Sequence, residues 1–512
     1  MIIIYHHNNK LISVTKDGIE IPFESPNISK TLFILAEKFS SEWLIWCHIE
    51  LKEYLNTTSF EKIFHHNKIM ASFTVNKLKD YLPESIGYIE ESVFLKVNRK
   101  VSYPTWLMSS DAGGIHASVL LKFINKIKVN QNFNYFLNSV AKNGYLKGLL
   151  CYSEPKLILD NEITISVQQA SIFDLFKFVK QHYRTRWTFI LFLNFLFFEK
   201  RLTIIPLFLS VRFKNLKKIG IDLSEILVQS KLKVIDKKTI DVIIPTIGRK
   251  KYLYDVLKDL AKQTHLPKNV IIVEQNPIEE SVSELDYVSK EEWPFLIKHI
   301  FTHQAGACNA RNLALSQVTS EWVFLNDDDN RFDSNLLNDI FCKIEQYGVF
   351  AATTSYIQKN EKLVFKTIHQ SGIFGSGNSF VKSSCLKNVS FSMALEFGYG
   401  EDSDFGLQLR HEGFDIIYFP EPAIIHLKAP FGGFRIKPKF EWDNEIYQPK
   451  PSPTIMYVKQ KYMTQKQIKG YKFILFFKIM KKQSFFKWNS IYKFLNEKWN
   501  VSLKWSEKLE NF

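Results

Sequence analysis

The second half of the chain alternates short, continuous apolar runs with segments in which apolar residues recur every three or four positions. The runs IDVIIPT, residues 240–246, and NVIIVEQN, residues 269–276, are rich in β-branched residues and predict two strands. The segment between them has helical spacing, carried by Leu253, Val256, Leu257 and Leu260. A strand, a helix and a strand in succession predict a βαβ unit with parallel strands and a right-handed crossover.

Polar residues stand directly after both predicted strands. Thr246 and Arg249 follow the first strand, and Glu274 and Asn276 close the second. Ligands of parallel α/β sheets bind beyond the carboxyl ends of the strands. These side chains are therefore candidates for a binding site at one edge of the sheet.

A third apolar run, WVFL at residues 322–325, predicts another strand of this sheet and leads into Asp327, Asp328 and Asp329. Neighbouring carboxylates repel one another and raise one another's pKa, so a bound cation would compensate them. Mg²⁺ and Mn²⁺ take oxygen ligands of this kind. A solvated turn is the alternative, because aspartate is common where strands end.

The segment AGACNAR, residues 305–311, precedes that strand and predicts the start of a helix. Its small residues permit close approach of the backbone, and its N-terminal amides would face an anion. Arg311 adds a fixed positive charge. We therefore expect a phosphate-bearing ligand beside the aspartates.

A second acidic group occurs in GYGEDSDFGLQLRHEGFDIIYFPEPAIIH, residues 398–426. Glu401, Asp402 and Asp404 stand at the start of a predicted short helix, where acidic residues stabilise the helix dipole. A carboxylate at such a place can also act as a general base. The residue pattern alone leaves both roles open.

These motifs together resemble family 2 glycosyltransferases of the GT-A fold. The resemblance rests on Pro245 to Arg249, Glu274, the segment GACNARN at residues 306–312, and the aspartate run. The Glu-Asp pair, an LRxxG pattern, a Pro-Glu pair and His426 then follow in the order found in that family. Members are inverting enzymes that use nucleotide-diphosphate sugars. The resemblance runs from Thr239 to roughly Phe431 and implies a Rossmann-like, mainly parallel α/β sheet flanked by helices.

The resemblance also implies roles for individual residues. Asp402 would be the catalytic base and Glu401 its neighbour on the acceptor side, and Glu274 would contact the nucleotide base. The residues implied in nucleotide-sugar binding are Pro245, Thr246, Arg249, Glu274, Asn309, Arg311, Asp327 and Asp328. Those implied in metal binding are Asp329, Asp328 and His426. The segment GSGNSFVKSS, residues 375–384, would admit the acceptor and the sugar, with a glycine-rich turn as the alternative.

The register of the aspartate motif stays open in the sequence. In one alignment Asn326 replaces the family's first aspartate and Asp328 becomes the metal ligand. In the other, one position along, Asp327 and Asp329 form the Asp-x-Asp pair.

The family implies a divalent cofactor, Mn²⁺ or Mg²⁺, and a nucleotide-diphosphate sugar donor, with a UDP-sugar expected. The acceptor would be a glycan or a lipid-linked molecule in bacterial surface polysaccharide biosynthesis. The QxxRW signature and the membrane helices of processive synthases are not found in the sequence, which favours addition of single sugars. The alternative is a noncatalytic sugar-binding or scaffolding protein, against which the intact acidic motifs argue.

Two segments of the first half are similar in sequence to segments of the second half. SSEWLIWCHIEL, from Ser40, parallels TSEWVFLNDDDN, from Thr319, and NFNYFLNSVAKNGYLKGLLCYSEPKLI, from Asn132, parallels the Glu-Asp segment. The first half has His48, Ile49 and Glu50 at the positions of the three aspartates. It has Asn132 and Phe133 at the positions of the Glu-Asp pair. We therefore predict a degenerate, noncatalytic GT-A-like domain, with chance similarity as the alternative.

Composition adds limits on compartment and partners. Five cysteines without CxxC spacing predict neither disulfides nor a zinc site, and the N-terminal sequence lacks a signal-peptide pattern, so we expect a cytoplasmic protein. The run WTFILFLNFLFF, residues 187–198, is shorter than a membrane span and predicts a buried helix, or alternatively an interfacial one.

The net charge of +15 is concentrated near the C-terminus, where ten lysines and no acidic residue occur between Lys459 and Lys493. This basic aromatic tail predicts a helix docked on the protein, or peripheral contact with an anionic inner membrane face. Nucleic acid is not expected, because the sequence contains no nucleic-acid-binding motif. The four predicted parts are a degenerate GT-A-like domain at 1–160, a helical connector at 161–236, a catalytic GT-A domain at 237–435 and a basic helical extension at 436–512.

Overall fold

The structure is a computed structural model that describes residues 1–76, 80–129, 132–160, 163, 165–166, 168–217, 219–430, 439–484 and 487–510. It divides into two compact units. Unit 1 comprises residues 1–232 and 462–481, and unit 2 comprises residues 233–461 and 482–512. The boundaries predicted at residues 161 and 435 fall outside the described residues.

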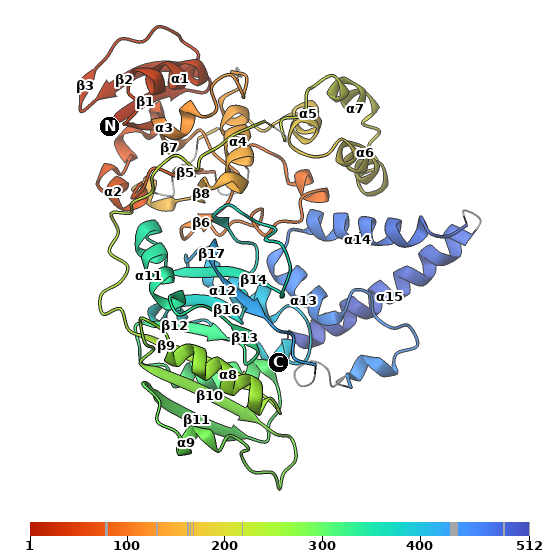
Figure 1. Cartoon of the computed structure of the whole chain (residues 1–512). Coiled ribbons are helices and arrows are strands. Elements are labelled where there is room, and N and C mark those ends of the chain that lie inside the picture. The colour runs from red at the N-terminus through yellow and green to blue at the C-terminus, as the bar shows by residue number, and fades with distance from the viewer. Residues whose placement is uncertain are drawn as a thin grey trace. The chain divides into compact units, whose positions relative to one another are not determined.

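Unit 2 is a mixed α/β sheet flanked by helices (Figure 1). Its strands are β9 (Ile240–Thr246), β10 (Asn269–Gln275), β11 (Leu296–Thr302), β12 (Trp322–Asn326), β13 (Asn330–Arg331), β14 (Ala351–Ile357), β15 (His369–Gln370), β16 (Asn378–Lys382) and β17 (Ile416–His426). Its α-helices are α8 (Lys250–Ala261), α9 (Tyr287–Lys290), α10 (Ala307–Ser316), α11 (Leu336–Tyr347), α12 (Glu401–His411), α13 (Pro453–Tyr462) and α15 (Trp488–Leu509). Short 3₁₀ turns are η6 (Ser383–Leu386), η7 (Met393–Leu395) and η9 (Glu441–Asn444).

The predicted βαβ unit is confirmed. β9 pairs in parallel with β10 on one side and with β12 on the other, and α8 lies between β9 and β10 in the chain. All residues of β10 and β12 are buried, as expected for strands covered on both faces. Since the three strands run the same way, Thr246, Gln275 and Asn326 close them at one edge of the sheet.

Buried Asp241 fixes how β12 enters this sheet. Its carboxylate accepts hydrogen bonds from the backbone N–H groups of Thr319 and Ser320 and from the Ser320 hydroxyl, at 2.7, 3.0 and 2.6 Å. The side-chain amide of Asn269 donates to the same carboxylate at 2.6 Å. One buried charge thereby joins β9, β10 and the segment before β12, which sets the register that delivers the aspartates to the sheet edge.

Unit 1 contains a second mixed sheet with its own core (Figure 1). Its strands are β1 (Ile2–His7), β2 (Lys10–Lys16), β3 (Ile19–Glu20), β4 (Trp43–His48), β5 (Ile69–Phe73), β6 (Tyr103–Pro104), β7 (Ala112–His116) and β8 (Leu150–Ser153). Its α-helices are α1 (Ile28–Lys38), α2 (Phe60–Ile63), α3 (Ala117–Leu121), α4 (Phe133–Gly144), α5 (Ile172–His182), α6 (Arg186–Glu199), α7 (Ile204–Val211) and α14 (Gln465–Met480). Its 3₁₀ turns are η1 (Ile49–Tyr54), η2 (Thr57–Ser59), η3 (Glu84–Tyr88), η4 (Tyr145–Lys147) and η5 (Pro155–Leu157).

The two sheets share strand order and strand direction over five strands. Unit 1 has the order β1-β4-β7-β5-β8, and unit 2 has β9-β12-β16-β14-β17. In both, the successive pairs are parallel, antiparallel, antiparallel and parallel. In both, a short strand also pairs antiparallel with the last strand, β6 with β8 and β15 with β17. The helices α4 and α12 precede the last strand in their units.

The shared Ser-Glu-Trp sequence has the same local role in both units. In unit 2, the Glu321 carboxylate accepts backbone N–H groups of residues 236–238, just before β9. In unit 1, the carboxylate of Glu42 accepts the amine of Met1, just before β1, at 2.6 Å. The glutamate therefore attaches the first strand of each sheet to the strand that follows the Ser-Glu-Trp sequence.

The units differ before that strand. Unit 2 places the parallel strands β10 and β11 beyond β9, whereas unit 1 places the antiparallel strands β2 and β3 beyond β1. Unit 1 thus has a β-meander where unit 2 has its βαβ unit.

The predicted connector contains helices α5, α6 and α7, which lie beside one another within unit 1 (Figure 1). The expected buried helix at residues 187–198 forms as α6, but its buried residues are only Thr188, Leu191, Asn194 and Phe195. In the described part of the chain, no helix combines the length and the apolar character needed to cross a bilayer.

The helix α14 of the basic tail docks on η3 of unit 1. Gln467 donates to the carbonyls of Glu90 and Ser92 at 3.0 and 2.8 Å, and Lys466 pairs with Glu199 at 2.6 Å. Gly470 faces the backbone of Tyr88 so closely that an added Cβ would lie 2.3 Å from its carbonyl oxygen. A glycine is required there because backbone cannot give way as a flexible side chain can.

We predict that Gly470→Ala loosens α14 from unit 1 and costs about 2 kcal/mol of docking free energy, because the new methyl meets a fixed carbonyl. The rate of limited trypsin cleavage within α14 should rise. Gly220→Ala is the matched control, since no atom lies within 4 Å of the Cβ position there. Alanine has a higher helix propensity than glycine, so faster cleavage in Gly470→Ala would not come from a weaker helix. Unchanged resistance to trypsin in this variant would contradict the predicted clash with the Tyr88 carbonyl.

Candidate active site

The three aspartates after β12 are held by different partners. Asp328 accepts the Thr246 hydroxyl on one oxygen and the Arg249 guanidinium on the other, both at 2.7 Å. Burial raises the pKa of Asp328 to about 6, although Arg249 acts in the opposite direction. Its two oxygens are therefore used inside the protein, and they tie the loop after β9 to the end of β12.

Asp329 lies beside the end of β17. Its Oδ1 is 3.3 Å from Nε2 of His426, and its Oδ2 accepts the backbone N–H of Ala429 at 2.8 Å. Burial raises the pKa of this carboxyl, but the contacts with His426 and Ala429 outweigh burial and lower it. Oδ1 is buried and receives no hydrogen bond of acceptable geometry, so it is an available ligand atom.

Asp327 contacts Arg311 and Tyr356. Its Oδ1 accepts Nη2 of Arg311 at 3.1 Å, and its Oδ2 lies 2.8 Å from the hydroxyl of Tyr356. The Tyr356 ring stacks on the imidazole of His426 with a centroid distance of 4.5 Å. Asp327, Asp329 and His426 each offer a ligand atom within 4.8 Å of the others, so among the described residues they are a candidate metal-ligating group.

Arg311, which contacts Asp327, is buried and has N–H groups without hydrogen-bond partners. Only 7% of the residue is exposed, and its Nε and Nη1 have no hydrogen-bond partner. Burial lowers its pKa, but the nearby carboxylates of Asp327, Asp402 and Glu401 raise it, so the guanidinium stays charged. Two unpartnered N–H groups on a buried cation are the donors that an anionic ligand would satisfy.

The predicted Glu-Asp pair forms the first turn of α12. Ser376 donates its hydroxyl to Oδ1 of Asp402. Burial raises the pKa of Asp402, while Arg311 and Ser376 act in the opposite direction. Burial and the neighbouring Asp402 also raise the pKa of Glu401.

The glycine-rich segment before β16 connects this pair with the metal-ligating group. Ser376 touches Asp402, and an added Cβ on the next residue, Gly377, would lie 2.1 Å from Oδ2 of Asp327. The structure thus brings both acidic motifs of the sequence to one place.

The helix α10 follows its prediction only in part. It starts at Ala307 as expected, but its N-terminal amides face a side chain of the protein. Glu396 accepts the backbone N–H groups of Cys308 and Asn309 at 3.1 and 2.8 Å. The expected anion at this helix terminus is therefore Glu396, which comes from a segment about 90 residues later in the chain and carries no local signal in the sequence.

The remaining predicted residues lie near the sheet edge with internal partners. Glu274 ends β10 and accepts Ser283 and the N–H of Glu284 at 2.5 and 3.0 Å, with His299 at 2.9 Å. Burial raises its pKa, but His299 and Ser283 outweigh burial and lower it. The side chain of Asn309 donates to the carbonyl of Gln304 at 3.4 Å, and Pro245 lies within β9.

Three residues of this site were not predicted from the sequence, Tyr356, Asn330 and Glu396, and Ser376 was predicted only as part of the segment 375–384. Asn330 donates its side-chain N–H groups to Asn326 and to the carbonyl of Gly377, at 2.5 and 2.7 Å, and its Oδ1 accepts the Tyr356 hydroxyl at 2.7 Å. A tyrosine near the end of an ordinary strand carries no functional signal in a single sequence. The position of Asn330, directly after the three aspartates, was the one available indication in the sequence.

Unit 1 has a different set of side chains at the corresponding edge. His48 and Glu50, aligned with Asp327 and Asp329 by the Ser-Glu-Trp sequence, form with His7 a group whose ligand atoms lie within 4.8 Å of one another. Imidazole nitrogens replace most of the carboxylate oxygens there, and such a set suits Zn²⁺ or Cu²⁺ rather than Mg²⁺.

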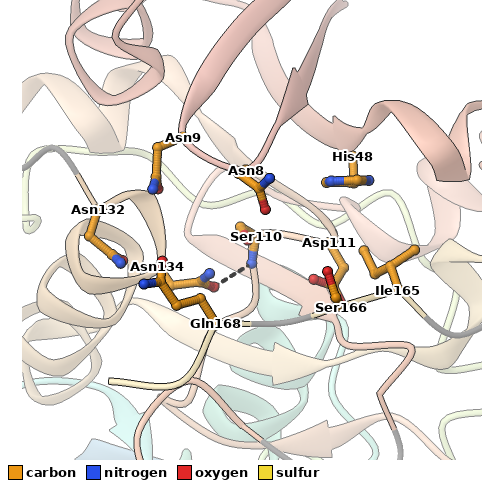
Figure 2. A pocket seen from close by; sticks show the side chains of 10 residues that line it. All are labelled: Asn8, Asn9, His48, Ser110, Asp111, Asn132, Asn134, Ile165, Ser166 and Gln168. Carbon is orange, nitrogen blue, oxygen red and sulfur yellow. Dashed lines mark hydrogen bonds between the residues drawn. The ribbon is translucent and has the colours of Figure 1, made fainter. Parts of the chain in front are cut away.

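A small pocket lies beside that group and is shown in Figure 2. It is lined by Asn8, Asn9, His48, Ser110, Asp111, Asn132, Asn134, Ile165, Ser166 and Gln168. Asn134 accepts the backbone N–H of Ser110 at 2.8 Å, drawn as a dashed line in Figure 2. The described lining contains no lysine or arginine that could bind a diphosphate.

The counterpart of Asp402 in unit 1 is Asn134. Both are the second residue of their helices, and each contacts a serine before the antiparallel strand, Ser110 or Ser376. The expected counterpart Phe133 is fully buried in the core. The sequence alignment was therefore wrong by one position here, because the matched glycines differ in place: Gly144 is the last residue of α4, whereas Gly413 lies beyond the end of α12.

Comparisons with known proteins agree with this description. Residues 241–397 match the family model "Glycosyl transferase family 2". An uncharacterised glycosyltransferase of Rickettsia conorii is 27% identical over 147 residues, which is 29% of this chain and 24% of the relative. One of Rickettsia bellii is 25% identical over 143 residues, or 28% of this chain and 20% of the relative. The chain thus spans about a quarter of the length of the curated relatives it matches.

Solved structures of low similarity were also found. S. aureus TarS residues 1–349 in complex with UDP-GlcNAc is 18% identical, with a TM-score of 0.34 over 53% of this chain and 74% of that one. A mannosyltransferase of Pyrobaculum calidifontis in complex with GDP-Man and Mn²⁺ is 17% identical, with a TM-score of 0.31 over 38% and 58%. The family model thus identifies residues 241–397, which contain the βαβ unit and the three aspartates, as a domain of glycosyl transferase family 2.

Proposed function

We propose that the protein is an inverting, metal-dependent glycosyltransferase that moves a sugar from a nucleotide-diphosphate sugar to an acceptor hydroxyl. The observation that carries this proposal is the convergence at one sheet edge of a metal-ligating group, a buried arginine with free N–H donors, and a carboxylate with a raised pKa. A carboxylate of that kind suits a general base, which must hold a proton during transfer. A UDP-sugar is the donor we expect.

The ligand set Asp327, Asp329 and His426 fits a divalent cation. Two carboxylates and an imidazole suit Mn²⁺, and Mg²⁺ also accepts the carboxylate oxygens. The buried Oδ1 of Asp329, whose near partner is Nε2 of His426 at 3.3 Å, supports this assignment, because a cation could bind between the two groups. A bound Mn²⁺ or Mg²⁺ would supply positive charge to the diphosphate that leaves with the nucleotide.

We assign Asp328 a different task within the aspartate run. Both its oxygens are engaged by Thr246 and Arg249, so it positions the loop after β9. This favours the alignment in which Asp327 and Asp329 are the Asp-x-Asp pair. Asp328 would then hold Arg249 in place for nucleotide binding and would not be a metal ligand.

Arg311 and Asp402 then act on the two ends of the reaction. Arg311 donates its free N–H groups to the diphosphate and offsets the charge that develops on it. Asp402 accepts the proton of the acceptor hydroxyl as that oxygen attacks the anomeric carbon, and the product has inverted configuration. Glu401 lies beside Asp402 on the same helix turn, where it can contact the acceptor.

Glu274 and Asn309 already have hydrogen-bond partners within the protein. Glu274 would bind the nucleotide base by releasing Ser283 or His299, and Asn309 is held at the start of α10 by Glu396. The internal contacts keep both residues placed at the sheet edge until the nucleotide arrives.

We propose that unit 1 is a diverged, noncatalytic GT-A-like domain. The shared order of five strands, the shared role of Glu42 and Glu321, and Asn134 in place of Asp402 support this origin. An amide is not basic enough to take a hydroxyl proton, so this copy would not transfer sugar by the same route. A wholly noncatalytic chain is disfavoured by the intact acids of unit 2.

The acceptor we propose is a glycan or lipid-linked molecule of bacterial surface polysaccharide biosynthesis, modified at the cytoplasmic face of the membrane. Five free cysteines support a reducing compartment. The basic tail supports peripheral contact with an anionic membrane, where a lipid-linked acceptor would reside.

Mn²⁺ binding should distinguish the three aspartates. We predict that Asp327→Asn and Asp329→Asn each weaken Mn²⁺ binding in the presence of UDP by about tenfold or more, because each removes a ligand. Asp328→Asn should stay close to the unmodified protein. Electron paramagnetic resonance of free Mn²⁺ measures this without requiring turnover. A larger loss for Asp328→Asn than for its neighbours would reverse the assignment.

Asp402→Asn should lower the rate of sugar transfer by about 10²- to 10⁴-fold, because it removes the general base. Binding of the nucleotide sugar, measured by calorimetry with Mn²⁺, should change little. Asn134→Asp, at the corresponding position of unit 1, is the matched control and should transfer sugar at the unmodified rate. Normal turnover by Asp402→Asn would refute the assignment of the base.

The pH profile should report on Ser376, which positions Asp402. Its hydroxyl lowers the pKa of Asp402, and the base must be ionised to work, so activity falls as pH decreases through that pKa. We expect Ser376→Ala to move the acid limb of kcat to higher pH. A mere structural role would reduce kcat at every pH alike and leave the limb in place.

A further inference from the structure

The helices α6 and α7 of unit 1 expose an unusual amount of apolar surface. Ile205 and Phe208 of α7 are 72% and 71% exposed, and Leu202 in the preceding loop is 67% exposed. The exposed apolar residues of this region are Phe189, Phe197, Leu202, Ile204, Ile205, Phe208, Leu209 and Val211. Apolar exposure concentrated on two helices that contact each other is typical of an interaction surface.

The sequence of α6 makes the exposure more informative. The helix RWTFILFLNFLFFE is apolar on nearly every side, and helices of this kind are normally enclosed by protein or by lipid. Here only four of its residues are buried within the described structure. Its 14 residues are too few for a membrane span, which takes roughly 20. Such a helix fits the interface of a bilayer, lying along it.

The charge around the apolar surface has one sign. From 184 to 217, a range that is described throughout, the exposed charged residues are Arg184, Arg186, Lys200, Arg201, Arg212, Lys214 and Lys217. The one acidic side chain at the ends of α6 and α7, Glu199, is half-buried and paired with Lys466 at 2.6 Å. Apolar side chains bordered by lysine and arginine complement the acyl and headgroup layers of an anionic membrane.

The helix α14 extends this surface. Phe197 of α6 contacts Phe473 of α14 with a ring-centroid distance of 5.9 Å. Phe477 is 39% exposed, and Lys469, Lys478 and Lys481 are exposed on or just after the same helix. The residues that dock α14 on η3 face the protein, so docking leaves these groups available.

We propose that α6, α7 and the exposed side of α14 form a docking surface for an anionic lipid bilayer. The apolar side chains enter the acyl boundary, and the lysines and arginines contact the headgroup phosphates. This inference extends the proposed membrane contact of the tail to a defined surface and assigns most of the apolar insertion to α7. A protein partner is less suited to this surface, because lysine is depleted in protein interfaces.

The test is cosedimentation of the full-length protein with vesicles. We expect binding to vesicles of equimolar phosphatidylcholine and phosphatidylglycerol, and at least about tenfold weaker binding to phosphatidylcholine alone at low salt. Ile205→Glu/Phe208→Glu should reduce partition into the anionic vesicles by at least about tenfold, because it places charge in the apolar surface. Both positions are exposed, so the fold should tolerate the change, which circular dichroism verifies.

The matched control is Leu227→Glu/Ile446→Glu, which changes residues of 86% and 93% exposure outside the surface and should bind like the unmodified protein. A second pair separates the charge contribution. Arg201→Gln/Arg212→Gln should weaken binding to anionic vesicles, and Lys251→Gln/Lys262→Gln, also exposed cations, should not.

Three results would overturn the proposal: no binding of the unmodified protein to anionic vesicles, equal binding by Ile205→Glu/Phe208→Glu, or a native oligomer that this variant converts to monomers in light scattering. The last result would identify the surface as a contact between copies of the chain. Hydrolysis of nucleotide sugars with Mn²⁺, measured without vesicles, should be unchanged in this variant. Failure of catalysis in the unmodified protein would therefore refute the proposed function and leave the vesicle result standing.

Discussion

The carboxylates of Asp327, Asp328 and Asp329 crowd the end of one buried strand, and the active edge of unit 2 is built around their repulsion. Asp328 is compensated inside the protein by Thr246 and Arg249. Asp327 and Asp329 lie on either side of it in the sequence and offer ligand atoms within 4.8 Å of each other, and the near partner of Oδ1 of Asp329 is His426 at 3.3 Å. A fold that satisfied all three would have no capacity for a ligand. Negative charge left uncompensated at this edge would favour a bound cation.

The two arginines of this edge also differ in how far their hydrogen-bonding groups are used inside the protein. Arg249 lies 2.7 Å from Asp328 and 3.5 Å from Asp329, whereas Arg311 keeps two buried N–H groups without hydrogen-bond partners. Glu396 caps α10 and thereby removes that helix terminus from the anion site. Diphosphate recognition would then depend on side chains and a metal, which respond to substitution more sharply than backbone amides do.

Comparison of the units separates what the scaffold needs from what the chemistry needs. Strand order, strand direction and the glutamate before the second shared strand recur in both, so they serve folding. The aspartate run, the Glu-Asp pair and the parallel strands beyond β9 occur in unit 2 and have no match among the described residues of unit 1. Unit 1 has instead exposed helices with an apolar and basic surface, which suits a role in placing the enzyme.

The sequence by itself determined the local elements and the edge where the site would form, because periodicity and strand direction are encoded over a few residues. It located β9, β10, β12, α12 and both acidic motifs. Only the tertiary structure decided which aspartate is engaged by Arg249, that Glu396 occupies the start of α10, and that Tyr356 joins the site. These contacts connect residues about 30 to 90 positions apart through a register set by packing across the sheet, which no local pattern records.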